Sequence, residues 1–218
     1  MVVRPQADNY SAGAWVATQF ARRYLTWRSG AALPGSSEVS PALGTHDAVA
    51  WAEVAGSSLA GTAANFLVAA DTSLHGLIYL DIALRRLPGG QYSLAHFPAI
   101  VAAPSGSSAG GALDGARLPS VANRALEIVV RRALANYLSG ASAELAADLA
   151  PGSRIETPGI RLALQAVERL AVEPSGAVLA TVVASDGEGD NYTLSYTVAV
   201  TLEAGRWELR SINPELGA

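Results

Sequence analysis

Residues 192–212 read YTLSYTVAVTLEAGRWELRSI and carry the clearest structural pattern in the chain. Up to Leu202, large apolar side chains alternate with small polar ones, which is the two-residue period of a β-strand with one dry face and one wetter face. Gly205 interrupts the pattern before a second strand-like run, Arg206–Ile212. The stretch therefore predicts two antiparallel strands joined by a hairpin.

The residues before this hairpin predict the rest of the second half. A helix over about Ser120–Ser139 has its large apolar residues on one side and ends at Gly140. A short helix follows and stops at Pro151-Gly152. Two more strand-like segments come next, at about 160–172 and 177–186. The second half is predicted as two helices and four strands.

The first half shows the same order of elements. Val16, Phe20, Tyr24 and Trp27 recur at spacings of four, four and three, which is one face of a helix over about 11–28. Four strand-like segments follow, at about 47–56, 62–71, 77–87 and 91–101. The last two are joined by Pro88-Gly89-Gly90, a strong turn signal.

The two halves also correspond residue by residue. Glu53 and Glu168, Gly61 and Gly176, Asp71 and Asp186, and Gly90 and Gly205 are each 115 positions apart. A fixed offset that relates the same order of elements indicates an internal duplication.

A long helix followed by an antiparallel meander lays its apolar stripe on one face of the sheet, and long strands curl around it. We therefore predict an α+β chain with two tandem nuclear transport factor 2-like (cystatin-like) α+β rolls, each a long helix packed on a curved antiparallel sheet. The first domain is expected at residues 8–103 and the second at 119–218. Residues 104–118 are rich in Ser, Gly and Ala and are predicted to be a flexible linker.

Composition excludes several classes of function. The chain has no cysteine, so disulfides and thiolate metal sites are excluded. The net charge is −4, and the 15 basic residues, all Arg, do not form one stripe, so direct nucleic-acid binding is not expected. No apolar run reaches the roughly 18 residues that span a bilayer, and the first eight residues do not resemble a secretory signal.

The candidate site residues are few, and each has a structural alternative. Asp81 lies in the middle of an apolar strand beside Tyr79, and in a cone-shaped pocket it could act as a buried base. Leu80 and Ile82 look like the inward-facing residues, however, which favours a solvent-facing Asp81. Trp27 and Trp207 are core residues or contacts for a protein partner. No metal or cofactor site is predicted, because His46, His75 and His96 lack ligand spacing.

The order of motifs resembles the conjugal transfer protein TcpC family of type IV secretion machinery. The resembling residues extend over nearly the whole chain: Phe20-Ala21, Tyr24-Leu25-Thr26-Trp27, Ala102-Ala103-Pro104, Tyr137-Leu138, Pro151-Gly152, Ile155, Pro158-Gly159 and Gly205-Arg206-Trp207. The resemblance implies a membrane-anchored protein whose two nuclear transport factor 2-like domains lie outside the cytoplasm. It further implies trimers that dock other subunits of the DNA-transfer channel. The family is not enzymatic, so no catalytic residues carry over.

The sequence differs from the family in one respect, since the N-terminal cytoplasmic segment and membrane helix are missing. We expect that this anchor precedes Met1 in the natural protein; a natively soluble chain is the alternative. The leading hypothesis is thus a non-enzymatic scaffold at the cell envelope. The alternatives are an isomerase- or dehydratase-type enzyme that uses the cone pocket of the first domain, and a ligand-binding module without a role in transfer.

Overall fold

The structure, a computed structural model, describes residues 5–26, 47–104 and 118–212, with side chains described from Tyr10 onward. The helices are α1 (Pro5–Leu25), α2 (Arg124–Ser139) and α3 (Ser142–Ala146). The strands before α2 are β1 (Val49–Ala60), β2 (Ala63–Thr72), β3 (Gly76–Arg86), β4 (Tyr92–Leu94) and β5 (Ala99–Val101). The strands after it are β6 (Ala163–Val172), β7 (Val178–Ser185), β8 (Asn191–Glu203) and β9 (Arg206–Ile212). The prediction of an α+β chain with antiparallel sheets is confirmed.

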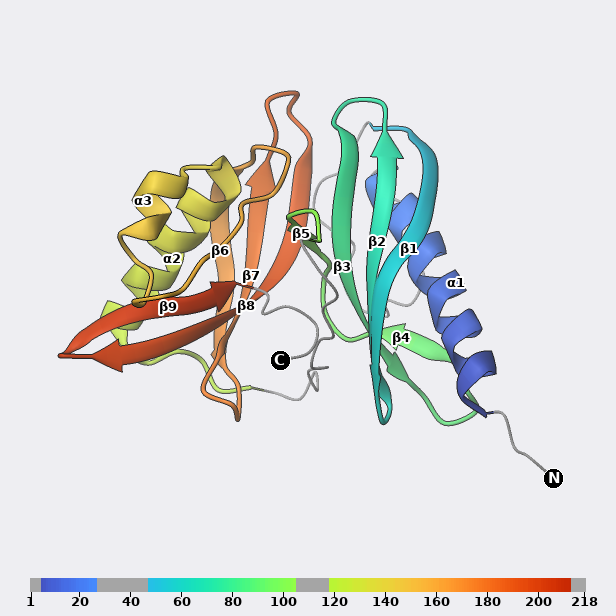
Figure 1. The fold of residues 1–218 in the computed structure, drawn as a ribbon, viewed down its shortest axis with the longest axis horizontal. Helices are drawn as coiled ribbons and strands as arrows, with labels where there is room; N and C mark the ends of the chain where they lie inside the picture. Colours follow the sequence, from blue (N-terminus) through green and yellow to red (C-terminus); the bar gives the residue numbers. More distant parts are fainter. Residues whose placement is uncertain (1–4, 27–46, 105–117, 213–218) are drawn as a thin grey trace.

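The strands form two antiparallel sheets with the same order of neighbours. The first is β1-β2-β3-β4, with β5 also paired to β3, and the second is β6-β7-β8-β9. Figure 1 shows the two sheets between the helices, with α1 on the outer side of the first sheet and α2 and α3 on the outer side of the second. Each long helix thus contacts the sheet of its own half, α1 on β1 to β3 and α2 on β6 and β9.

The apolar face of α1 packs on the first sheet and fills the hydrophobic core of the first half. Ala17, Phe20, Ala21 and Tyr24 are buried, and they share one core cluster with the side chains of β2 and β3 that face the helix. Those strand residues alternate, as the two-residue period requires: Phe66, Val68, Ala70, Ile78, Leu80, Ile82 and Leu84. Burial of such side chains supplies most of the stabilisation of the fold.

The start of α2 differs from the prediction for an identifiable reason. α2 begins at Arg124 rather than near Ser120, because the Asn123 side chain caps it by accepting a hydrogen bond from the Leu126 N–H at 3.1 Å. Ser120 instead forms a bridge with Ala171 of β6. The helix ends as predicted at Gly140, which adopts φ 74°.

The strand predicted over residues 91–101 is interrupted. β4 ends with Leu94 opposite Leu84, and β5 begins with Ala99 opposite Asp81. The segment between β4 and β5 is therefore longer than the segment of β3 between their pairing partners. The Ala95 N–H still donates to the Ala83 carbonyl, but Pro98 has no N–H to continue the ladder. The interruption shapes β5 as a separate short strand beside β8 (Figure 1).

The buried side chains of the two halves form one contiguous cluster, which includes Phe20 and Ile82 from the first half and Tyr137 and Leu194 from the second. The division into domains at residues 8–103 and 119–218 stays a prediction. Among the described residues, no helix is both long and apolar enough to span a membrane.

Candidate functional site

The N-terminal part of β8 is where the two halves meet. From Asn191 to Thr197 this strand pairs with β7, and β9 joins its other side from Val198 onward. On that other side the first half supplies partners instead. The Ser195 N–H donates to the Pro98 carbonyl at 3.0 Å, and the Tyr24 hydroxyl donates to the Thr193 carbonyl at 2.6 Å. The first half therefore covers a sheet edge that would otherwise be open to pairing with other chains.

This contact corrects the prediction of a wetter face on β8. Thr193 is 6% exposed and Ser195 is 1% exposed, so both belong to the buried surface. The alternation itself is real, because Tyr192, Leu194 and Tyr196 face the core. The polar face of β8 is buried at Thr193 and Ser195 because the first half of the chain covers it.

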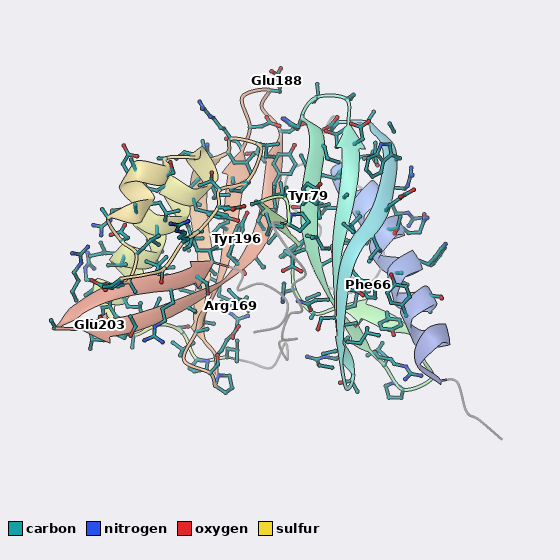
Figure 2. All side chains as sticks on the ribbon, in the orientation of Figure 1. Phe66, Tyr79, Arg169, Glu188, Tyr196 and Glu203 are labelled. Carbon is teal, nitrogen blue, oxygen red and sulfur yellow. The ribbon has the colours of Figure 1, made fainter. Side chains whose placement is uncertain are left out.

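Three buried tyrosines lie along the junction: Tyr24 of α1, Tyr137 of α2 and Tyr196 of β8. The Tyr196 hydroxyl donates to the Ile100 carbonyl of β5 at 3.1 Å. The rings of Tyr137 and Tyr196 meet edge to face with centroids 5.6 Å apart. Burial raises the pKa of all three phenols above the ordinary value, so they remain protonated hydrogen-bond donors. Figure 2 labels Tyr196 among the strands of the second sheet.

Asp81 lies near this tyrosine layer. It is opposite Leu67 and Ala99 in the strand register, on the face of the sheet away from α1, as the sequence predicts. The prediction that it faces solvent is wrong, however, because the residue is half-buried and its carboxylate oxygen Oδ1 is shielded from water. Burial raises the pKa of Asp81 to about 6, and the charge of Asp81 contributes to the raised pKa of Tyr137.

A second polar contact joins the halves at the β2–β3 and β7–β8 turns. His75 Nε2 lies 3.0 Å from Asp186 Oδ2, and the Tyr192 hydroxyl donates to the same oxygen at 3.1 Å. The same hydroxyl is 3.2 Å from His75 Nε2. A carboxylate can only accept, so Nε2 carries a proton in this contact. The side chain of His75 is 14% exposed and that of Asp186 is 1% exposed.

Sequence reasoning missed this His75–Asp186 pair. His75 lies in the turn between β2 and β3, and its partner is 111 positions away. The offset that matches Asp71 to Asp186 relates the two halves without showing which parts of them touch. No local signal in the sequence connects these two turns.

Of the other residues that the sequence singled out, Tyr79 and Trp207 lie in different sheets. Tyr79 lies on the same sheet face as Asp81, opposite Ala69 and Val101, and is half-buried. Trp207 lies opposite Leu202 in the C-terminal hairpin and packs against the core cluster. Trp27 is outside the described residues. Tyr79 and Asp81 thus share one face of the first sheet, whereas Trp207 lies in the second sheet.

α1 packs closely on the first sheet at Gly13. Gly13 of α1 lies so close to the sheet that an added Cβ would be 2.7 Å from Phe66 Cζ. A hollow of about 90 Å³ lies at the rim, lined by Leu59, Gly61, Thr62, Ala63, Ala64, Arg86 and Tyr92. It is far smaller than the roughly 300–1,000 Å³ of usual ligand sites. Within residues 5–26, 47–104 and 118–212, no group of three His, Asp or Glu residues is arranged to hold a metal ion.

No protein-family model matches the chain, and no curated protein matches it. Among solved structures, the chain is similar to one described as "Ntf2 like protein involved in plasmid conjugation". The two are 12% identical over 78% of each chain, with a TM-score of 0.40. A TM-score of 0.40 is too low to transfer a function from that protein to this chain.

Proposed function

We propose that this chain is a non-enzymatic assembly subunit of a conjugative DNA-transfer apparatus of the type IV secretion kind. In this proposal it consists of two tandem nuclear transport factor 2-like domains of the TcpC type. It acts through protein–protein contacts with other channel subunits and with further copies of itself, as a trimer. Its place is the outer side of the plasma membrane, where a membrane helix preceding this sequence anchors it.

The observation that carries the proposal is the way the polar side chains are used. The helix-facing side of the first sheet is filled by the chain's own residues, with Phe66 in contact distance of Gly13. The buried polar groups at the junction, Tyr24, Tyr196 and His75, bond to the other half of the chain. Polar side chains that hydrogen-bond one half of the chain to the other favour a rigid binding protein over an enzyme. The motif order in the sequence supplies the link to conjugation.

The enzyme alternative has less support. It requires Asp81 or Tyr79 to line the cone pocket beside the helix, whereas both lie on the opposite face of the sheet. A carboxyl with a pKa of about 6 suits a general base, but a base must also reach a bound substrate. The rim hollow is lined by neither residue.

A transfer assay in donor cells tests the proposal. Deletion of the gene should reduce conjugation frequency by several orders of magnitude, and the full-length gene supplied in trans should restore it. Complementation with Asp81→Asn or Tyr79→Phe should restore transfer to the same level, because a scaffold does not need an ionisable group at either position. Affinity purification of the complementing protein should recover channel subunits.

The outcomes separate the two hypotheses. Unchanged transfer in the deletion strain would show that the chain is not a transfer subunit. Loss of transfer with Asp81→Asn, while the variant protein remains folded and abundant, would favour the enzyme. A variant at a half-exposed residue of the same sheet face, Asp71→Asn, serves as the matched control.

A further inference from the structure

The hollow at the rim of the first sheet, about 90 Å³ in volume, combines a cationic side chain with an apolar wall. Two hairpins, β1–β2 and β3–β4, form this wall. The first supplies the apolar side chains of Leu59 and Ala64 and the hydroxyl of Thr62. The second supplies Arg86 and Tyr92. The Arg86 N–H donates to the Thr62 carbonyl at 2.6 Å, so the two sides of the hollow are held together.

The strand register fixes where the Arg86 side chain lies. Arg86 is two residues beyond Leu84, which belongs to the core, so it lies on the face of β3 that is turned toward α1. Its partner on β4 is Tyr92, and a Cβ added to Gly13 of α1 would be 3.3 Å from Tyr92 Cζ. A Cβ added to Gly90 would be 3.9 Å from Arg86 Nη2. The half-buried guanidinium thus lies beside the β3–β4 turn, at the edge of the space between α1 and the sheet.

The charge of Arg86 is not neutralised by an acidic side chain. Arg131, Arg132 and Arg206 each form an ion pair with an Asp or Glu. Within residues 5–26, 47–104 and 118–212, the Arg86 guanidinium has no ion pair and no hydrogen bond. The hairpin segments 59–64 and 84–94 contain two arginines and no Asp or Glu. The hollow therefore has a positive charge at its rim, although the whole chain has a net charge of −4.

The second sheet shows that the fold does not need a charge at this place. The pair β8–β9 has the same position in the strand order as β3–β4. There Leu202 lies opposite Trp207, where the first sheet has Arg86 opposite Tyr92. Leu202 is 55% exposed, so an apolar side chain is accepted at the equivalent position. An aromatic residue is present in both pairs, whereas the guanidinium is present in the first alone. The guanidinium of Arg86 is thus available for a ligand.

We propose that the hollow binds a carboxylate on a short alkyl stem, with Arg86 bonding the carboxylate and with Leu59 and Ala64 in contact with the stem. A guanidinium presents two parallel N–H donors that match the two oxygens of a carboxylate. A hollow needs about 10–15 Å³ to admit one water, so one of about 90 Å³ admits a group of a few heavy atoms and no larger substrate. The carboxylate belongs either to a free small acid or to a Glu side chain of a partner protein. Such binding does not depend on a role of the chain in DNA transfer.

Titration of the ¹⁵N-labelled protein, followed by two-dimensional NMR at pH 7 and constant ionic strength, tests the site. Butyrate represents the free acid, and the peptide acetyl-Ala-Glu-Ala-amide represents the side chain of a partner. We expect saturable shifts of the amide signals of Gly61, Thr62 and Gly90, with a Kd of about 1–10 mM for at least one of the two probes. The probe that binds more tightly identifies the source of the carboxylate. Butyramide, which has the shape of butyrate without its charge, should give no saturable shift.

Variants at Arg86 show whether the guanidinium is responsible. Arg86→Gln should raise the Kd at least about tenfold, because the charge-assisted hydrogen bonds are lost. Arg86→Lys keeps the charge but not the two parallel donors, so its Kd should lie between those of the parent and Arg86→Gln. Arg23→Gln is the matched control, because it changes the net charge by the same amount at an exposed position of α1. It should leave the Kd unchanged.

Three results would overturn the carboxylate site: no saturable shift with either probe, a Kd that Arg86→Gln leaves unchanged, or inorganic phosphate that binds as tightly as the better probe. The last result would mean that the hollow selects charge alone and that its apolar wall contributes nothing. If Arg86→Gln does not fold, as judged by the dispersion of its NMR spectrum, Leu59→Glu decides the question. Leu59 is 40% exposed, and a carboxylate placed there competes for the guanidinium and should abolish binding. Binding that persists in Leu59→Glu would overturn the site as well.

Discussion

Asp81 shows how the environment of a single residue determines its chemistry. Its strand position places it on the face of the sheet away from α1, opposite the apolar residues Leu67 and Ala99. Burial disfavours the carboxylate and raises its pKa from 3.8 to about 6. At neutral pH the folded protein therefore holds a poorly solvated charge, which costs stability.

Asp81→Asn should make the protein more stable at pH 8, by about 1–3 kcal/mol, because the amide fills the same space without a charge. Below about pH 3 the carboxyl is mostly protonated in both the folded and the unfolded chain, so the difference should disappear there. Between these limits the stability of the parent falls as pH rises through about 6, since the folded state holds this proton more tightly than the unfolded state does. Urea unfolding of parent and variant across this pH range measures the effect.

Asp71→Asn is the control, because Asp71 is half-exposed on the same face of the sheet. It should change stability by no more than about 0.5 kcal/mol. An Asp81→Asn variant that is less stable than the parent at pH 8 would contradict the account, because it would mean that the charge is compensated.

At the scale of elements, the packing of α1 on its sheet depends on the absence of a side chain at Gly13. A Cβ built there would be 2.7 Å from Cζ and 2.9 Å from Cε2 of Phe66, and 3.3 Å from Cζ of Tyr92. Phe66 is fully buried, so its ring has little freedom to move away. Helix propensity favours alanine over glycine by roughly 0.5–1 kcal/mol, but here the space for the extra methyl group is taken.

Gly13→Ala should therefore destabilise the protein by about 1–3 kcal/mol, the usual cost of overpacking. Ala12→Gly, at the exposed neighbouring position, isolates the propensity term and should cost about 0.5–1 kcal/mol. Adding Phe66→Leu to Gly13→Ala should cost less than the sum of the two single changes, because the smaller side chain makes room. Thermal unfolding of the four variants tests this. A gain in stability from Gly13→Ala alone would show that the helix is not packed this closely.

The sequence predicted most elements because periodicity reports which residues face the core. The hairpin at Pro88-Gly89-Gly90 and the strand 206–212 follow from local signals that the structure bears out. The strand predicted over 62–71 is found one residue later, at Ala63–Thr72. Ser120 looked like a helix start, but Asn123 is the residue that caps the first N–H groups. The gap between β4 and β5 was missed because alternation continues across Phe97 although Pro98 cannot pair.

At the scale of the whole molecule, the sequence indicated a repeated unit but not how the two copies pack. The contact between Tyr24 and Thr193 joins residues 169 positions apart, and the one between Ile100 and Tyr196 joins residues 96 apart. The repeat offset relates the two halves without indicating which of their residues touch. For the same reason, no local sequence pattern could predict the burial of the polar side of β8 or the His75–Asp186 pair.

The way the halves pack makes a prediction about cooperativity. Their buried side chains form one cluster, and the edge of β8 obtains hydrogen-bond partners from Pro98 and Tyr24. If either half unfolds, the other loses those partners and exposes apolar surface. We therefore expect a single thermal transition, with the calorimetric enthalpy equal to the van't Hoff enthalpy.

Tyr24→Phe tests whether the junction carries this coupling. It removes the donor to the buried Thr193 carbonyl and should cost about 1–3 kcal/mol while lowering the midpoint of the whole transition. Tyr10→Phe, an exposed position on the same helix, should leave the midpoint unchanged. Two separated transitions in the parent, or a Tyr24→Phe effect confined to one of them, would mean that the halves fold as independent domains and that the contacts along β8 do not couple them.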